Sequence, residues 1–250
     1  MTDIILNGCN GKMGAAVTKA VSERDDCRIV AGVDLYGDNA NFKVYRSFSQ
    51  LDVKGDVIID FSNPSVLDSM LEYAKNSNTP MIICTTGFSE DQVSKIKEAS
   101  KDVAVFYSGN MSLGINLIIE LSKKAASILG NNFDVEIIEK HHNQKIDAPS
   151  GTALMIADGI SEVLTESQYV YDRHSYRKKR DKNEIGIHAI RGGTIVGEHE
   201  VIFAGHDEIF SLKHQALSKE VFAVGAVNAA VYLKDKQSGM YDMGNLLSET

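Results

Sequence analysis

The stretch DIILNGCNGKMG, residues 3–14, decides the fold of the first part of the chain. Its apolar run at 3–7 is typical of a buried strand, and the small and apolar residues of 13–21 recur at helical spacing. Between these runs, Gly8, Gly11 and Gly14 form a Gly-x-x-Gly-x-x-Gly loop, a variant of the dinucleotide fingerprint. Such glycines permit a tight turn and a close approach of the backbone to a pyrophosphate at the helix N-terminus. The stretch therefore predicts a strand, loop and helix that bind a dinucleotide.

The alternation of strands and helices continues beyond this unit. Apolar runs at 28–33, 57–60, 81–84 and 103–106 are separated by segments of helical spacing. Such repeats build an open parallel sheet, whose ligands lie at the carboxyl ends of the strands. The loops at 61–64 and 84–87 should therefore line the cofactor groove.

An acidic residue indicates which nicotinamide cofactor is used. Asp34 follows the run at 28–33, about twenty residues beyond Gly14. At this position of the fingerprint a carboxylate accepts hydrogen bonds from the ribose hydroxyls. An acid favours the free 2′-hydroxyl of NAD, and Leu35 and Tyr36 supply no arginine for a 2′-phosphate, although Lys12 is one available cation. We expect NADH to be preferred, with NADPH as the alternative.

The pattern changes after residue 111. A helical segment at 115–129, a strand at 133–138 and a helix after residue 150 are followed by a polar stretch at 165–184 typical of an excursion loop. Three strand patterns follow at 185–191, 195–204 and 208–214, and the absence of helices between them predicts an antiparallel or mixed sheet. A helix at 218–233 would return to the first domain. We predict an α/β fold: a Rossmann-type parallel-sheet domain from 1–111 and 218–250, and an inserted α+β domain with a mixed sheet from 112–217.

Composition and charge limit the classes of function that the protein can have. The net charge of −8 disfavours nucleic acid and membrane surfaces as partners, and the one basic run, at 177–180, is interpreted as a solvated loop. The three cysteines are too few and too scattered for a disulfide framework, and reduced thiols indicate a cytoplasmic protein. No apolar run approaches the roughly 20 residues of a membrane span.

The segment EKHHNQKIDAPSGTA, residues 139–153, contains an anion site at the start of a helix. Ser150 is a good N-cap, and the backbone N–H groups of Gly151 and Thr152 point at the helix mouth, where a carboxylate would be stabilised.

Two histidines and a lysine precede that helix. His141 and His142 carry imidazoles that titrate near neutral pH, at about 6.5 when unperturbed, and Lys145 adds a positive charge. A metal site is the alternative, because Glu139 and Asp147 are also possible ligands. Adjacent histidines on an extended chain project to opposite faces, however, so we expect no metal. With a nicotinamide cofactor on the other domain, the segment predicts hydride transfer coupled to protonation.

We expect the remaining histidines to have structural roles. His174, His188 and His206 are interpreted as buried, hydrogen-bonded structural groups. His199 and His214 lie in strand patterns and are expected to face the sheet interior with hydrogen-bond partners.

With both motifs placed, the chain resembles the 4-hydroxy-tetrahydrodipicolinate reductase family, the dihydrodipicolinate reductases of the diaminopimelate route to lysine. The resemblance runs almost from end to end. Its most specific piece is segment 139–153, and supporting pieces lie at 8–14, 60–62, 85–87, 110–116 and 191–199.

The resemblance implies that hydride from C4 of NADH or NADPH reduces a small cyclic dicarboxylate, 4-hydroxy-tetrahydrodipicolinate or dihydrodipicolinate, to tetrahydrodipicolinate. His141 would donate or accept a proton and Lys145 would be the second proton donor. The implied substrate contacts are His142, Ser150, Gly151, Thr152 and Thr86. The implied cofactor contacts are Gly8, Cys9, Asn10, Gly11, Lys12, Met13, Asp34, Phe61, Cys84, Thr85, Thr86, Ser108, Gly109, Asn110 and Met111.

The family also implies a homotetramer assembled through the sheet of the second domain, which binds substrate. Two alternatives stay open: another two-domain NAD(P)-dependent amino-acid dehydrogenase, and a non-catalytic NAD(P)-binding sensor.

Overall fold

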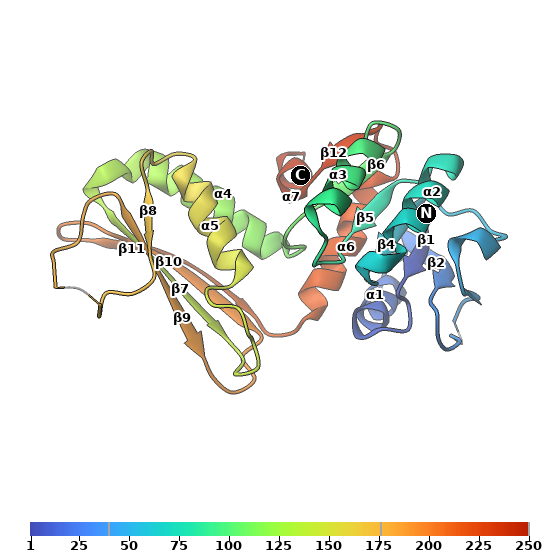
Figure 1. Cartoon of the computed structure of the whole chain (residues 1–250), viewed down its shortest axis with the longest axis horizontal. Helices are drawn as coiled ribbons and strands as arrows, with labels where there is room; N and C mark the ends of the chain where they lie inside the picture. Colours follow the sequence, from blue (N-terminus) through green and yellow to red (C-terminus); the bar gives the residue numbers. More distant parts are fainter. Residues whose placement is uncertain (40, 176, 250) are drawn as a thin grey trace. The chain divides into compact units, whose positions relative to one another are not determined.

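Two sheets organise the computed structural model of the protein, which describes residues 1–39, 41–175 and 177–249 (Figure 1). They belong to two compact units. Unit 1 comprises Met1–Ser112 and Lys219–Thr250, and unit 2 comprises Leu113–Ser218, so the second unit is inserted into the first along the chain.

Unit 1 is built on a seven-stranded parallel sheet with the order β12-β6-β5-β4-β1-β2-β3. Its strands are β1 (Thr2–Asn7), β2 (Cys27–Val33), β3 (Val44–Tyr45), β4 (Val57–Asp60), β5 (Met81–Ile83), β6 (Ala104–Tyr107) and β12 (Gly239–Tyr241). Its helices are α1 (Lys12–Ser22), α2 (Leu67–Ser77), α3 (Glu90–Ala99), α6 (Glu220–Leu233) and α7 (Met243–Ser248), with short 3-10 turns η1 (Phe48–Gln50) and η2 (Pro64–Val66).

The strands of unit 1 are continuous apolar runs because helices cover both faces of a parallel sheet. Ile4, Ile5 and Leu6 of β1 all have zero exposure, so neighbouring residues on opposite faces of the strand are equally buried. Met70 of α2 and Ile96 of α3 pack in one cluster with Ile5. Helix α6 contacts β4, β5 and β6, and α1 contacts α6 and β2. Because the strands of this sheet are parallel, their carboxyl ends lie at one edge.

Unit 2 contains a five-stranded mixed sheet with the order β11-β10-β7-β9-β8. Strand β7 (Asp134–His141) runs parallel to β9 (Glu184–Arg191) and antiparallel to β10 (Gly197–Ala204). Strand β11 (Ile209–Ala216) pairs antiparallel with β10, and β8 (Gln168–Val170) pairs parallel with β9. Helices α4 (Leu113–Leu129) and α5 (Gly151–Ser161) pack on one face of this sheet, and a 3-10 turn η3 (Gly130–Asn132) follows α4 (Figure 1).

Period-two alternation determines which residues of β7 enter the core of unit 2. Val135 and Ile137 are buried and pack with Ile115 of α4 and Ile156 of α5. Side chains at the intervening positions project from the opposite face, as the pleat of a strand requires.

The predicted fold class is confirmed, because a parallel Rossmann-type sheet is combined with an inserted mixed sheet. The stretch 165–184, predicted as a loop throughout, nevertheless contains β8, and β3 and β12 were not predicted as strands. Each of these strands has two or three residues, too few to produce a period-two pattern. In the described part of the chain, no helix is long and apolar enough to cross a membrane.

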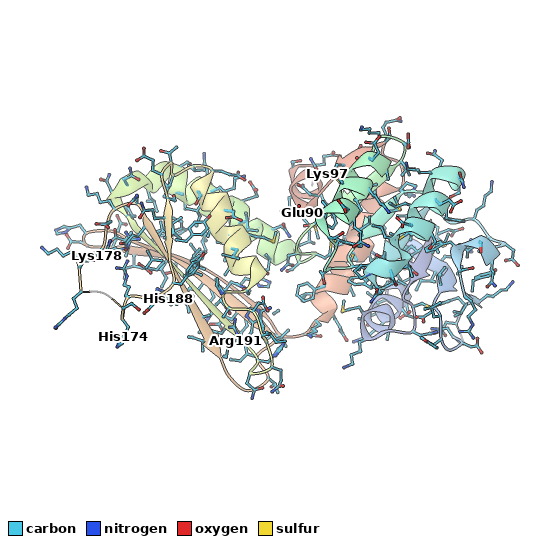
Figure 2. All side chains as sticks on the ribbon, in the orientation of Figure 1. Glu90, Lys97, His174, Lys178, His188 and Arg191 are labelled. Atoms are coloured by element: carbon cyan, nitrogen blue, oxygen red, sulfur yellow. The ribbon has the colours of Figure 1, made fainter. Side chains whose placement is uncertain are left out.

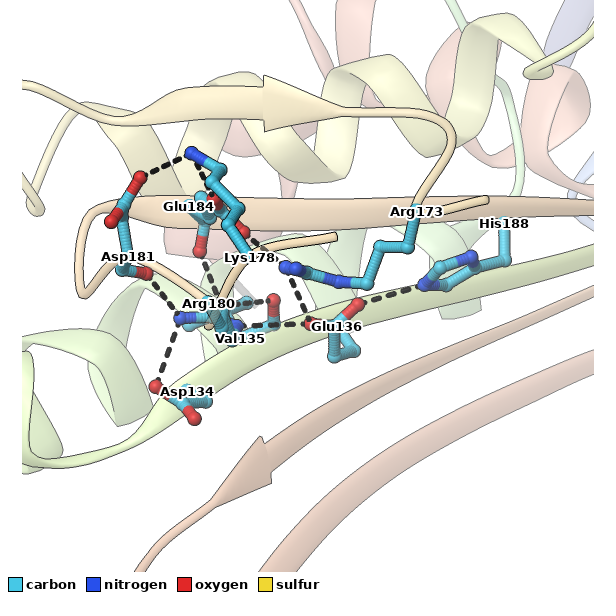
Figure 3. Close-up of polar contacts among 9 residues, drawn as sticks. All are labelled: Asp134, Val135, Glu136, Arg173, Lys178, Arg180, Asp181, Glu184 and His188. Carbon is cyan, nitrogen blue, oxygen red and sulfur yellow. Dashed lines mark hydrogen bonds and ion pairs between the residues drawn. The ribbon is translucent and has the colours of Figure 1, made fainter. Parts of the chain in front are cut away.

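The basic run at 177–180 is only partly solvated, which corrects its interpretation as a loop in water. The Arg180 side chain is 15% exposed and forms ion pairs with Asp134 and Glu136 at 2.9 and 3.0 Å (Figure 3). Arg180 also donates to the backbone carbonyl of Val135 at 3.0 Å. This arginine therefore fastens the loop between β8 and β9 to strand β7.

Candidate active site

The loop after β1 requires glycine at two positions of the fingerprint. Gly8 has φ of +76°, and a Cβ there would lie 2.4 Å from the backbone oxygen of Phe61. A Cβ at Gly14 would lie 2.4 Å from the backbone oxygens of Gly8 and Cys9. A side chain at either position would therefore displace the loop from α1 or from the end of β4.

Helix α1 begins with backbone donors exposed to a ligand. Its N-cap is Gly11, and no described side chain caps it, whereas Ser150 caps α5 by accepting from the N–H of Ala153 at 3.2 Å. The first N–H groups of a helix have no partner inside the helix, and the helix dipole favours an anion there. This arrangement fits a pyrophosphate, so the loop is suited to hold a dinucleotide.

A pocket of about 550 Å³ lies beside this loop and is lined by Gly8, Gly11, Asp34, Tyr36 and Phe61, among others. The carboxylate of Asp34 accepts from the backbone N–H groups of Asn10 at 3.0 Å and Tyr36 at 3.1 Å. Asp34 therefore joins the glycine loop to the segment after β2, with its carboxylate at the wall of the pocket.

Arg46 lines the same pocket and is not among the predicted cofactor residues. It follows β3 and donates to the backbone oxygens of Leu35 at 3.1 Å and Gly37 at 3.0 Å. Its side chain is 48% exposed. No spacing motif marked this arginine, because only the pairing of β3 with β2 brings it beside Asp34.

A buried carboxylate lies beneath these loops. Asp60 at the end of β4 accepts from the side-chain amide of Asn7 at 2.8 Å and from Ser62, and the Ser62 N–H also donates to Thr85 Oγ1 at 2.8 Å. Burial raises the pKa of Asp60 in spite of these donors. The network ties together the carboxyl ends of β1, β4 and β5.

The other predicted cofactor residues follow β5 and β6. Thr85 is buried and Thr86 exposed, and burial raises the pKa of the Cys84 thiol well above its usual value. After β6, Ser108 donates to the backbone oxygen of Asn110 at 3.0 Å, and Met111 is 4% exposed. All predicted cofactor residues thus lie in or after loops at the carboxyl ends of parallel strands, the edge at which such sheets bind ligands. Those at this edge are Gly8, Cys9, Asn10, Gly11, Lys12, Met13, Asp34, Phe61, Cys84, Thr85, Thr86, Ser108, Gly109, Asn110 and Met111.

In unit 2, strand β7 places Glu139 and His141 on one face. The side chain of Glu139 has zero exposure, and its Oε2 lies 2.7 Å from Nδ1 of His141, which is 11% exposed. A Cβ at Gly197 of β10 would lie 3.2 Å from Nε2 of His141, so glycine there leaves room beside that nitrogen.

Arg191 lies at the end of β9 (Figure 2). It pairs with Glu139 through two hydrogen bonds, each of 2.7 Å. Burial raises the pKa of Glu139, but the hydrogen bonds from Arg191 and His141 outweigh it, and the pKa lies below its usual value. Arg191 also donates to the backbone oxygen of Asp147 at 2.7 Å, and the carboxylate of Asp147 pairs with Lys145 at 2.9 Å.

Two histidines lie together at the start of α5. His199 of β10 is 3% exposed, and its Nε2 lies 3.0 Å from Oγ of Ser150. Burial, with the neighbouring His141, lowers the pKa of His199 to about 4, so this ring is neutral at pH 7. Burial also lowers the pKa of His141, where Glu139 acts in the opposite direction. The ring centroids of His141 and His199 are 5.2 Å apart.

The structure gathers most of the predicted substrate site around the start of α5. The N–H of Ser150 donates to Glu139 at 3.0 Å. Its Oγ accepts from the N–H of Ala153 and lies 3.0 Å from Nε2 of His199, so both polar groups of this residue have partners within the protein. Gly151 and Thr152 form the first turn of α5, and His142 is half-buried just beyond β7. Thr86 belongs to unit 1.

Several interpretations of single residues need correction or addition. His206 has a side chain that is 97% exposed, and His174 is also exposed, so neither is the buried group expected. His188 has the expected hydrogen-bond partner, Glu136 at 2.8 Å, but its side chain is 40% exposed; Figure 2 labels His174 and His188. From the sequence, Glu139 is only a possible metal ligand and Arg191 has no predicted role. The spacing of Glu139 and His141 by two residues in a strand was a usable signal, because such residues share a face.

The chain is similar to known proteins over nearly its whole length. Two family models match, described as dihydrodipicolinate reductase, N-terminus, over residues 2–111, and dihydrodipicolinate reductase, C-terminus, over residues 114–247.

Individual relatives match over nearly the full length. The chain is 51% identical to a 4-hydroxy-tetrahydrodipicolinate reductase of Clostridium novyi, over 99% of this chain and 98% of that one. It is 49% identical to a protein of the same description from Clostridium tetani, over 99% and 98%. A structure of dipicolinate-bound dihydrodipicolinate reductase from Paenisporosarcina sp. TG-14 has the same fold, with a TM-score of 0.80, 24% identity and 97% coverage of both chains.

Proposed function

The chain belongs to the dihydrodipicolinate reductase family, and from this premise we propose that it reduces 4-hydroxy-tetrahydrodipicolinate or dihydrodipicolinate to tetrahydrodipicolinate in the diaminopimelate route to lysine. The proposal is supported by one observation: segment 139–153 contains His141, Lys145 and the N-terminus of α5 at Ser150. Their combination suits an anionic substrate that must be protonated.

NADH or NADPH supplies a hydride when bound, and the loop residues 8–13, Asp34, Phe61, 84–86 and 108–111 would hold it. Reduction adds this hydride to the substrate ring, and the displaced electron pair takes up one proton. His141, whose Nδ1–H is bound to Glu139, binds a proton at its free Nε2 and delivers it from that atom, which returns the ring to the neutral Nδ1–H form. Lys145 balances the negative charge of the substrate and is the second group that can supply this one proton. The N–H groups of Gly151 and Thr152 hold a carboxylate, with contacts from His142, Ser150 and Thr86.

The test is to generate the substrate with the preceding synthase and to follow NADH absorbance. We expect substrate-dependent oxidation, and Lys145→Ala should lower kcat by about 10²- to 10⁴-fold because it removes a proton donor. Binding of NADH without oxidation would instead favour a cofactor-binding sensor. Oxidation of NADPH or NADH only with an α-keto acid and ammonia would favour an amino-acid dehydrogenase.

We also propose that NADH is preferred and NADPH accepted. Asp34 at the pocket wall suits a free ribose hydroxyl, while Arg46 in the same pocket is a cation for a 2′-phosphate. The ratio of kcat/KM for the two nucleotides measures the preference. Arg46→Ala should lower kcat/KM for NADPH more than for NADH, and an equal effect on both would show that Arg46 does not contact the phosphate.

Unit 1 is proposed as the dinucleotide-binding domain and unit 2 as the substrate-binding and oligomerisation domain of a cytoplasmic homotetramer. The face of the unit 2 sheet opposite α4 and α5 supports this assembly, because Ile190 there is 45% exposed beside the ion pair of Lys140 and Glu198. Light scattering should give the mass of four chains, and a monomer at micromolar concentration would contradict the proposal.

A further inference from the structure

Three parts of the proposed substrate site are tied to one buried carboxylate. The carboxylate of Glu139 lies 2.7 Å from Nδ1 of His141. It accepts a hydrogen bond of 3.0 Å from the backbone N–H of Ser150, the N-cap of α5. It is paired with Arg191, which in turn donates to the backbone oxygen of Asp147. The proton-transfer ring, the helix mouth and the lysine-bearing loop therefore share one point of attachment.

The partners of Glu139 determine its charge. An arginine and a backbone N–H can only donate hydrogen bonds, so both carboxylate oxygens must act as acceptors toward Arg191 and Ser150. The guanidinium of Arg191 is always charged, and its bidentate pairing with Glu139 favours the carboxylate anion. Glu139 is consequently an acceptor toward its third partner as well.

This charge fixes which nitrogen of His141 carries a proton. A carboxylate anion has no hydrogen to donate, so the contact of 2.7 Å requires the hydrogen to lie on Nδ1 of His141. In the neutral ring, Nε2 is then the basic nitrogen, and it lies beside Gly197, where a side chain is absent.

We propose that Glu139, held by Arg191, is a positioning residue that fixes the Nδ1–H form of His141 and the start of α5 together. The proposal deepens the proposed function, because it rests on proton transfer by His141. In chemical terms, one buried ion pair sets the distance between the nitrogen that moves a proton and the N–H groups that hold a carboxylate.

The groups that face His141 come from every neighbouring element. Glu139 lies on β7, Arg191 on β9 and His199 on β10, and Lys145 lies on the loop before α5. Burial lowers the pKa of His141, Glu139 raises it, and the charges of Lys145 and Arg191 lower it further, while His199 is neutral at pH 7. Removing the charge of Glu139 should therefore lower the pKa of His141 further.

Histidine-selective nitrogen NMR of the full chain tests the proposal, with His141→Gln used to assign the His141 signals. In the wild type we expect the Nδ1–H form of His141. In Glu139→Gln we expect a mixture of the two neutral forms, a lower pKa of His141 and a kcat lowered by about 10²-fold, since mispositioning of a reacting group has an effect of this size. An Nε2–H form in the wild type, or an unchanged spectrum and kcat in Glu139→Gln, would overturn the proposal.

The chain offers a matched control on the opposite face of the same strand. Glu136 of β7 lies 2.8 Å from Nε2 of His188, so it forms a second carboxylate and histidine pair away from the site (Figure 3). Glu136→Gln should leave the His141 signals and kcat unchanged. Loss of the Nδ1–H form in this variant would show that any change in the charge of β7 has the same effect, which contradicts a specific role of Glu139.

A second variant keeps the test valid if Glu139→Gln does not fold, because removing one member of a buried ion pair leaves a charge without a partner. Glu139→Gln with Arg191→Gln retains a neutral hydrogen-bonded pair and should show the same loss of the Nδ1–H form. The spectrum also separates this proposal from the proposed function. If His141→Gln kept full activity, proton transfer by His141 would be refuted, while the wild-type spectrum would still decide the role of Glu139.

Discussion

His199 should make the stability of the protein depend on pH in a defined window. Its ring is 3% exposed, packs against His141 and has a hydrogen-bond partner at Nε2 in Ser150. Burial places its pKa at about 4 in the folded chain, compared with about 6.5 in an unfolded chain. The perturbation of interest is His199→Gln, which retains a side-chain amide for Ser150 but cannot titrate.

Proton linkage gives the sign and the size of the change in unfolding free energy with pH. Because the folded pKa lies below the unfolded one, the unfolded chain binds more protons between these two values, and stability rises with pH. The contribution of neutral His199 is fully present above pH 6.5 and is lost as the pH falls toward 4. At 1.36 kcal/mol per pKa unit, the total loss is about 3 kcal/mol, of which about 2 kcal/mol is lost by pH 5.

Urea unfolding of the wild type and of His199→Gln, followed by circular dichroism from about pH 7.5 to about pH 5, measures this effect. The wild type should lose about 2 kcal/mol of unfolding free energy relative to the variant over that range. His206→Gln is the control, because the His206 side chain is 97% exposed, and its difference from the wild type should be constant with pH. A constant difference for His199→Gln as well would refute the reasoning.

Three further changes have defined outcomes. Gly8→Ala should weaken NADH binding at least about tenfold by calorimetry, because its Cβ would lie 2.4 Å from the Phe61 oxygen at a left-handed φ; wild-type affinity would contradict the geometry of the loop. Ile137→Ala should lower the unfolding free energy in urea by about 2–5 kcal/mol, since the side chain has zero exposure, and a loss below about 1 kcal/mol would show that the core of unit 2 refills the cavity. Arg180→Ala should expose the segment between β8 and β9 to limited proteolysis, because that arginine holds it to β7, and an unchanged cleavage rate would show that other contacts suffice.

Local sequence patterns were enough to predict the architecture and part of the site. The glycine spacing at 8–14 reflects contacts within one strand, loop and helix, so it can be recognised without knowledge of distant residues. The same holds for the N-cap at Ser150, whose hydrogen bond to Ala153 spans three residues. Fold class follows from such units because their order limits the sheets that can form.

The residues that the sequence did not reveal act across strands far apart in the chain. Arg191 meets Glu139 because β7 and β9 pair in a register that sets His141 opposite Arg191. Arg46 reaches the wall of the nucleotide pocket only through the pairing of β3 with β2. The alternation within one strand decides which face is buried, but which residues of two distant strands lie opposite each other depends on how those strands pack in the folded chain.

The initial rate of NADH oxidation with enzymatically generated substrate, measured for His141→Gln against His188→Gln, tests the central claim most directly. Both variants remove a histidine that is paired with a carboxylate of the same sheet, but only His141 lies in segment 139–153. We predict that kcat falls by about 10²- to 10⁴-fold in His141→Gln, with little change in the KM for NADH, and stays at the wild-type value in His188→Gln. A wild-type kcat in His141→Gln would contradict the assignment of proton transfer to this segment.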